Sequence, residues 1–237
     1  MVRVFPAGLA TLSMLFSLSL RAADEGPWSG KVALGYLASS GNTDTSAFNF
    51  SSETNFDRNA WHHTLVLRAL GSSTDGDTTA EAYRAAYKLK YDYSKRTYVF
   101  GLVDWDKDRF SGYDQQLYEA LGFGRRILES ERHELSAELG AGARQSDLRD
   151  GSSADEFVGF ASAEYSLKIS ENSSFDQKFG SFFGSENTYL ESISELRAKV
   201  VGGIALVLSY TVKHNTEVPA GSKKTDTYSA VSLEYAF

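Results

Sequence analysis

The sequence predicts an all-β fold, a transmembrane antiparallel β-barrel of about 12 strands in an up-and-down meander. Three observations predict it. Apolar and polar residues alternate along most of the chain, as they do in strands with one lipid-facing and one wet side. Short turns alternate with longer polar loops. The last strand, 225–237, ends in the aromatic residues Tyr235 and Phe237.

The beginning of the chain resembles a leader for export. Residues 1–22 combine a basic start at Arg3, an apolar stretch and a small residue at Ala22, which is typical of a cleaved signal peptide. A membrane-anchoring helix is the alternative, and Pro6 argues against it. We therefore expect a signal peptide over 1–22 and an outer-membrane barrel domain over 23–237.

Composition excludes several classes of function. The net charge is −7, and the leader contributes only arginines, so a nucleic-acid partner is not expected. The absence of cysteine excludes disulfides and thiol chemistry. Beyond the leader no apolar run reaches the length of a membrane helix.

The first four expected strands alternate clearly. They cover 28–37, 48–56, 61–69 and 83–93. Their outward rows carry large apolar residues, namely Val32, Leu34, Tyr36, Phe48, Phe50, Phe56, Trp61, Leu65, Leu67, Tyr83, Tyr87 and Tyr91. Lys31, Glu53, Arg68, Arg84 and Lys88 fall on the opposite rows. This pattern predicts a charged lumen inside an apolar wall.

The next two strands, 98–105 and 117–127, show no clear alternation of apolar and polar residues, so their orientation is ambiguous. The ninth strand, 175–183, has the same difficulty. Because these three strands are uncertain, totals of ten or fourteen strands remain open.

The remaining strands alternate again, over 134–144, 157–168, 190–200, 204–213 and 225–237. Short turns are expected near 57–60, 94–96, 128–132, 169–172 and 201–203, and longer loops near 71–79, 106–114, 145–154, 184–187 and 216–224. Short periplasmic turns and longer outer loops are typical of barrels in the outer membrane of a Gram-negative bacterium. A soluble β-sandwich is the alternative, but it would have to bury nearly every outward row.

Aromatic residues recur at the strand ends. Trp61, Tyr91, Tyr93, Tyr98, Tyr165 and Tyr235 lie near the short turns, and Tyr36, Tyr83, Phe157 and Tyr210 lie near the loops. Tyr and Trp favour the half-wet membrane interface, so we expect two aromatic girdles. At the end of the chain, Tyr235 and Phe237 are expected to form the assembly signal.

The candidate functional residues are charges of both signs on the inward rows. They are Arg84, Lys88, Glu134, Glu138, Arg144, Glu164, Lys168, Glu191, Glu195 and Arg197. Buried charges must be paired or hydrated. Mixed signs therefore predict either a lumen cross-linked by ion pairs or a narrow water-filled path, with low conductance in either case. A strongly ion-selective pore would show rings of one sign.

A cluster of acids could in principle bind a cation. Asp104, Asp106, Asp108 and Asp114 surround the expected loop 106–114. Carboxylates suit calcium, but the spacing of known calcium loops is absent, and Lys107 and its neighbours can neutralise the acids. We expect a solvated, self-paired loop, no metal site and no cofactor.

A lipid hydrolase is the alternative function, since a serine–histidine pair on a barrel wall could perform nucleophilic catalysis. His63, His133 and His214 end apolar rows, and His62 lies on the other face of its strand. They are expected to be interfacial residues, so no catalytic residue is predicted.

A surface-interaction protein is a third class of function, and the short polar loops give no positive evidence for it. The expected partners are outer-membrane lipids and the barrel assembly machinery, and the chain is expected to be a monomer.

Three motifs resemble a known family. They are Ser40-Gly41-Asn42-Thr43, the run from Asp108 to Asp114 leading into Gly122-Phe123-Gly124, and Lys224-Thr225-Asp226-Thr227 ahead of the final strand. In this order and spacing they resemble the YdiY-like salt-induced outer-membrane proteins, a family of unknown function. The resemblance implies an outer-membrane barrel and no catalytic residue or substrate, and the salt association in the family's name describes when such proteins appear. The leading hypothesis that rests on it is envelope integrity or small-solute passage under salt or osmotic stress.

Overall fold

The computed structural model describes residues 26–39, 44–109, 113–149, 151–218 and 223–237. The expected leader and the motif Ser40–Thr43 lie outside the described residues. The described residues contain no helix that is long and apolar enough to cross a membrane.

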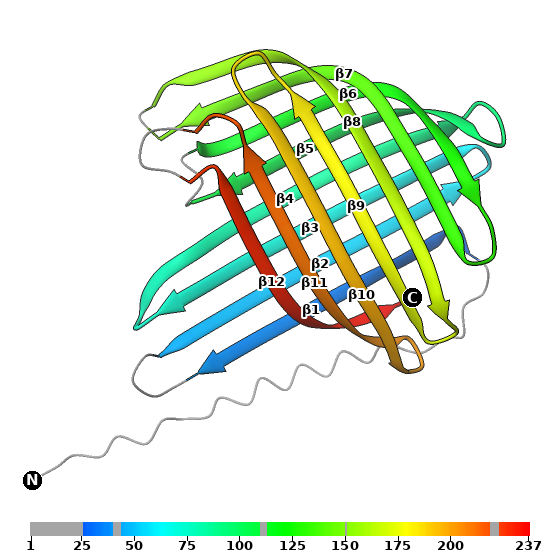
Figure 1. Ribbon diagram of the computed structural model, residues 1–237, viewed down its shortest axis with the longest axis horizontal. Coiled ribbons are helices and arrows are strands. Elements are labelled where there is room, and N and C mark those ends of the chain that lie inside the picture. The colour runs from blue at the N-terminus through cyan, green and yellow to red at the C-terminus, as the bar shows by residue number, and fades with distance from the viewer. Residues whose placement is uncertain (1–25, 40–43, 110–112, 150, 219–222) are drawn as a thin grey trace, which may run out of the picture.

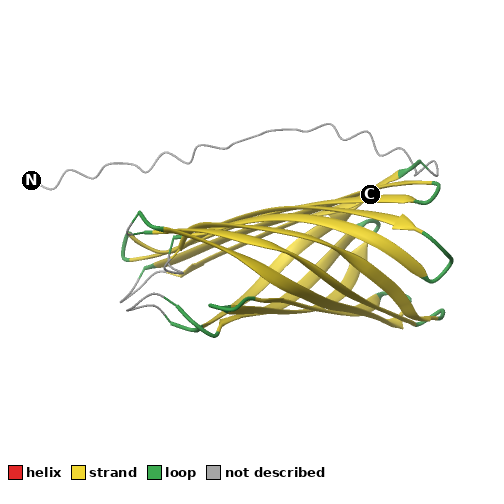
Figure 2. Ribbon diagram, turned by 90° about the horizontal axis from the view of Figure 1, so that it is seen from above, coloured by secondary structure: helices red, strands yellow, loops and turns green. Residues whose placement is uncertain are grey.

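Twelve antiparallel strands close into a barrel in which each strand pairs with its neighbours in the chain (Figure 1). The strands are β1 Trp28–Ser39, β2 Thr45–Arg58, β3 Trp61–Thr74, β4 Asp77–Asp92, β5 Thr97–Asp108, β6 Tyr113–Glu129, β7 His133–Leu148, β8 Ser153–Ser170, β9 Ser173–Phe183, β10 Thr188–Val201, β11 Ile204–Asn215 and β12 Thr225–Ala236. The predicted fold class and the count of twelve are confirmed. Figure 2 shows the connections gathered at the two ends of the barrel.

The outward rows form an apolar exterior. Exposed outward residues include Leu34, Leu65, Leu67, Val99, Val103, Leu121, Phe123, Leu139, Leu206, Leu208, Val231 and Leu233. A soluble protein does not expose so much contiguous apolar surface, whereas a barrel wall in lipid requires it. The protein is therefore an outer-membrane β-barrel, and the sandwich alternative is wrong.

Several strands continue beyond the expected boundaries. The loop expected over 71–79 is mostly strand, because β3 runs to Thr74 and β4 begins at Asp77. Asp75 and Gly76 alone make the turn, with φ of 52° and 87°. An Asp-Gly pair accepts positive φ readily and suits a tight hairpin turn. The expected difference in length between outer loops and periplasmic turns is therefore smaller than the sequence indicated.

The ambiguous strands β5 and β6 have a clear orientation in the structure. Tyr98, Phe100 and Asp104 on β5 are buried, whereas Val99 and Val103 are exposed. The placement of Tyr98 in the aromatic girdle is therefore wrong, since its side chain is 1% exposed and faces the lumen. Tyr36, Tyr83, Phe157 and Tyr210 at the loop end are exposed, as a girdle requires.

Candidate functional site in the barrel lumen

One side of the lumen is filled by aromatic side chains. This aromatic cluster consists of Tyr98, Phe100, Tyr118, Phe160, Phe182 and Tyr189, contributed by β5, β6, β8, β9 and β10. The ring centroids of Tyr118 and Phe182 are 4.4 Å apart, and those of Phe160 and Phe182 are 5.0 Å apart. The cluster occupies space that would be open in a wide pore.

Glycines on β6 make room for these rings. A Cβ atom on Gly124 would lie 2.2 Å from Cε2 of Tyr98, and one on Gly122 would lie 2.8 Å from Cε1 of Phe100. Such distances are shorter than atoms tolerate, so positions 122 and 124 of this inward row need residues without side chains. The Gly122-Phe123-Gly124 motif therefore shapes the lumen.

The rest of the lumen is crossed by ion pairs that join strands on opposite walls. Arg84 on β4 donates two hydrogen bonds to Asp104, of 2.9 and 2.6 Å, and one of 2.7 Å from Nη1 to Oε2 of Glu191 on β10. The paired, two-point contact with Asp104 is among the strongest geometries of an ion pair in proteins. One arginine thus links β4 to both β5 and β10.

Three more pairs cross the lumen in the same way. Their nitrogen–oxygen distances are 3.2 Å for Lys178–Glu53, 3.1 Å for Lys213–Asp106 and 2.7 Å for Lys88–Glu138. They join β9 to β2, β11 to β5 and β4 to β7. We call these three pairs and Arg84–Glu191 the cross-lumen pairs.

Glu138 gathers the largest set of donors. Besides Lys88, it accepts hydrogen bonds from the Tyr98 hydroxyl at 3.1 Å and from the Ser162 hydroxyl at 2.8 Å, and Lys90 lies 3.4 Å away. Glu138 is 3% exposed. Because an isolated buried charge is very unfavourable, these donors are what allow the carboxylate to stay ionised there.

Two cavities remain between the walls. The outer cavity has a volume of about 150 Å³, lies toward the loops and reaches β1 and β12. The inner cavity has a volume of about 350 Å³ and lies toward the periplasmic turns, beside the aromatic cluster. Both are lined by Glu53, Arg68, Arg84, Lys178, Glu191 and Ile193, so the two cavities meet at these residues. The outer cavity carries five basic residues, Lys31, Arg68, Arg84, Lys178 and Lys213, and five acidic ones, Glu53, Asp106, Glu191, Glu195 and Glu234.

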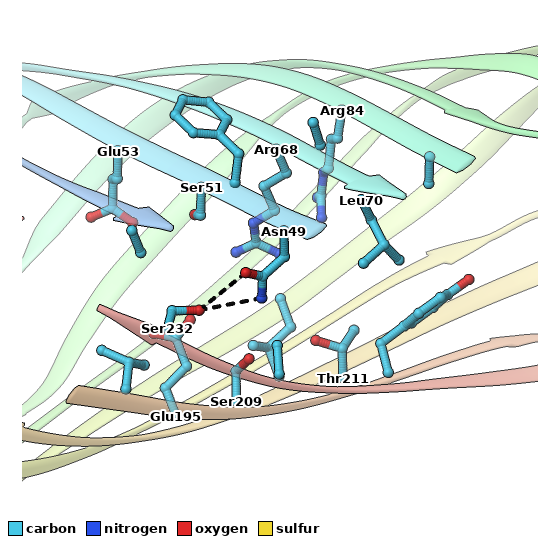
Figure 3. A pocket seen from close by; sticks show the side chains of 18 of the residues that line it. Asn49, Ser51, Glu53, Arg68, Leu70, Arg84, Glu195, Ser209, Thr211 and Ser232 are labelled. Carbon is cyan, nitrogen blue, oxygen red and sulfur yellow. Dashed lines mark hydrogen bonds between the residues drawn. The ribbon is translucent and has the colours of Figure 1, made fainter. Parts of the chain in front are cut away.

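Arg68 differs from the other charges at this junction. Its side chain extends into the outer cavity beside Asn49 (Figure 3). Among the described residues, the guanidinium has no hydrogen bond or ion pair within contact distance, although its charge acts on Glu53 and Glu191 through space. It is therefore available to a bound anion.

Most of the predicted lumen charges lie in these networks. Arg84, Lys88, Glu138 and Glu191 belong to the cross-lumen pairs, and Glu164 lies 4.0 Å from Lys88.

The remaining predicted charges lie outside the cross-lumen pairs. Arg197 contacts Glu234 and Asp176 at 2.6 Å each and Glu195 at 3.5 Å. Arg144 pairs with Glu156 and also donates to the backbone oxygen of Asn187. Glu134 and Lys168 are exposed at the periplasmic rim, and no ion pair is formed by either within the described part of the chain.

Of the four acids expected in a self-paired loop, only Asp114 is exposed and pairs with Lys107, at 3.5 Å. Asp104, Asp106 and Asp108 lie on the inward row of β5, and their partners are Arg84, Lys213 and the Tyr228 hydroxyl. The prediction failed because the strand continues to Asp108, which places these carboxylates in the lumen. The described residues include no group of acids and histidines that could hold a metal ion.

Each histidine ring has a partner other than serine. His63 and His133 contact the hydroxyls of Tyr87 and Tyr165, and His214 contacts Thr225. His62 lies between Asp57 at 2.7 Å and Asp92 at 3.1 Å. Within the described residues no histidine ring contacts a serine hydroxyl, so the serine–histidine pair of the lipid-hydrolase alternative is not formed there.

The chain end takes part in barrel closure. The backbone of Phe237 exchanges two hydrogen bonds of 2.9 Å with Gly30, and its ring stacks on Tyr235 with centroids 6.4 Å apart. A Cβ atom on Gly30 would lie 2.7 Å from Cζ of Phe237. The expected assembly signal thus lies at the place where β1 and β12 meet.

Sequence comparison agrees with this architecture. Residues 32–237 match the family described as "Protein of unknown function, DUF481". The chain belongs to this DUF481 family. It is also 30% identical over 216 residues to the uncharacterized protein YdiY of Escherichia coli strain K12, covering 91% of this chain and 85% of YdiY. The resemblance to YdiY-like proteins is therefore confirmed.

Structure comparison adds a solved barrel to which this DUF481 member is similar. The COG4313 outer membrane channel from Pseudomonas putida F1 superposes with a TM-score of 0.53 at 10% sequence identity, over 91% of this chain and 97% of the channel. At such low identity the likeness supports the barrel fold and nothing finer.

Proposed function

We propose that the protein is a narrow passage of low conductance for small polar solutes across the outer membrane. The proposal rests on the lumen, where two cavities meet at a set of charged residues and the cross-lumen pairs limit the opening. Equal numbers of basic and acidic residues line the outer cavity, so we expect weak ion selectivity. The salt association implied by the family resemblance fits such a passage, because small solutes could equilibrate when the external salt concentration changes.

Planar-bilayer recording on the refolded protein tests this proposal. The wild-type protein should give small or brief conductance steps, because the cross-lumen pairs and the aromatic cluster restrict the lumen. Arg84→Ala removes the link between β4 and β10 and should raise the conductance several-fold. Lys107→Ala, which alters an exposed pair with Asp114, is the control and should behave as the wild type.

Uptake of small sugars and amino acids into vesicles completes the test. Solutes of a few heavy atoms should enter faster than into empty vesicles, and larger ones should not. A large, stable conductance of the wild type, or vesicles that remain as impermeable as lipid alone, would contradict the proposal.

A further inference from the structure

The barrel is closed by an unusually short ladder. β1 pairs with β2 over all of Trp28–Ser39, but it pairs with β12 only at Lys31–Leu34, opposite Leu233–Ala236. Backbone bonds between Gly30 and Phe237 extend this ladder at the periplasmic end. Toward the loops the two strands diverge (Figure 1). In the described residues, Gly35–Ser39 and Thr225–Ser232 therefore have a ladder partner on one side only. We call this part of the barrel the open seam.

A side-chain contact replaces the ladder where the open seam begins. Asn49 on β2 lies opposite Gly35 and reaches past it to Ser232 on β12, with Nδ2 donating to the serine oxygen at 3.2 Å (Figure 3). Gly35 permits this approach, because a Cβ atom there would lie 2.0 Å from Oδ1 of Asn49 and 2.4 Å from the Val231 oxygen. One hydrogen-bonded pair of neutral side chains contributes only about 1 kcal/mol, so the seam can open further at little cost.

The outer cavity reaches the open seam from inside. Lys31 and Ala33 on β1 and Tyr228, Ala230 and Ser232 on β12 all line it. Of these residues, Ala33, Ala230 and Ser232 are small. On the outer surface, Leu34, Tyr36, Val231 and Leu233 flank the same seam and are between 53% and 72% exposed. A charged cavity and the lipid face thus meet here with little side-chain material between them.

The charge balance of the cavity indicates which occupant fits. Every acidic residue that lines the outer cavity has a basic partner, since Glu53, Asp106 and Glu191 belong to cross-lumen pairs and both Glu195 and Glu234 contact Arg197. Arg68 is the basic residue without a contact partner in the described lumen. An added anion would therefore be paired there, whereas an added cation would find each carboxylate already neutralised.

We propose that the open seam is a lateral portal for a single-chain amphiphile with an anionic headgroup, a carboxylate or a phosphate, from the outer leaflet. The headgroup pairs with Arg68 in the outer cavity. The chain leaves through the open seam and lies along Tyr36 and Val231, which are both exposed on the outer wall. This binding is separate from the passage of small solutes and is measured separately.

Binding of dansyl-undecanoic acid to the refolded protein in detergent tests the headgroup site. The wild type should bind the probe, dodecyl phosphate should displace it, and Arg68→Gln should weaken binding about tenfold, as expected when a charge-assisted contact is lost. Arg125→Gln, which removes an exposed arginine on β6, is the matched control and should bind as the wild type. If inorganic phosphate displaced the probe as well as dodecyl phosphate does at the same concentration, the site would bind anions without a lipid portal, and the proposal would be overturned. Unchanged binding of the probe by Arg68→Gln would also overturn it.

Closing the seam tests the route. The chain has no cysteine, so the pair Tyr36→Cys and Val231→Cys forms the sole disulfide and joins positions that would face each other if the ladder continued. The oxidised pair should lose probe binding and recover it on reduction. The pair Leu34→Cys and Leu233→Cys, which closes a position already in the ladder, should bind throughout.

A second variant makes the test independent of disulfide formation. Ala230→Trp fills the same opening with a side chain and should also abolish binding, while heat-modifiable migration shows that the barrel is folded. Full binding by either a closed seam or a folded Ala230→Trp barrel would exclude the portal.

Discussion

At the residue scale, Glu138 carries the clearest prediction of stability. Glu138→Ala leaves Lys88, Lys90 and the Tyr98 hydroxyl without their shared acceptor. Breaking a buried charge network typically costs about 3–5 kcal/mol, and we expect a loss of that size in urea unfolding followed by tryptophan fluorescence. Glu134→Ala on the same strand is the control. Its side chain is exposed, so its effect should stay within about 0.5 kcal/mol, and equal losses for both variants would contradict the role of the network.

Gly124 gives a second prediction at this scale. Gly124→Ala places a Cβ atom against the Tyr98 ring, and overpacking of this kind costs about 1–3 kcal/mol. Gly180→Ala on the inward row of β9 meets nothing within 4 Å, so it should leave the free energy of unfolding nearly unchanged. The same urea titration compares the two, and an equal response would mean that ring packing does not restrict position 124.

The sequence was informative about single residues only where one row was apolar and the other polar. Arg84, Lys88 and Glu138 were placed in the lumen correctly for that reason. Tyr98 was misplaced because residues 98–105 are apolar on both faces, so the alternation gives no orientation. The glycines at 122 and 124 were the available signal, since they leave space that the rings of Tyr98 and Phe100 occupy.

At the element scale, β12 carries the prediction about assembly. Deleting Phe237 removes the two backbone bonds to Gly30 and the ring that covers it. The fraction of protein that reaches the folded, heat-modifiable form in the outer membrane should fall sharply, with less effect on the activity of the molecules that do assemble. Phe157→Ala changes an aromatic residue that is 91% exposed and distant from the chain end, and it should assemble normally. Normal assembly without Phe237 would place the closing signal elsewhere.

The positions of the strands could be predicted better than their lengths. Nine strands were found from alternation, and 98–105, 117–127 and 175–183 were found with an ambiguous orientation. The turn at Asp75-Gly76 was expected to be a loop over 71–79. Small polar residues such as Ser72 and Ser73 have weak strand propensity, yet they pair across β2 and β4 in the structure. At the loop ends of the strands, pairing with the neighbouring strands determines where a strand ends, and residue propensity alone does not reveal this length.

At the scale of the whole molecule, alternation and an even number of strands were enough to predict the closed barrel. The cross-lumen pairs and the open seam could not be predicted. Which residues face each other across the lumen depends on the tilt and stagger of the strands, and neither can be read from the alternation of a single strand. The partners Lys213 and Asp106 are 107 positions apart in the chain, and nothing in the sequence links them.

The short ladder between β1 and β12 also has a consequence for how the barrel folds. Every other pairing joins consecutive strands and can form as a hairpin, so its contact order is low. Joining β1 to β12 instead closes a ring of nearly the whole chain, and the entropy of ring closure opposes it. Few ladder bonds offset that entropy, so closure should be the last step of folding and the first to reverse. Hydrogen exchange measures this directly: the amides of β1 that pair with β12 should exchange faster than those between β6 and β7.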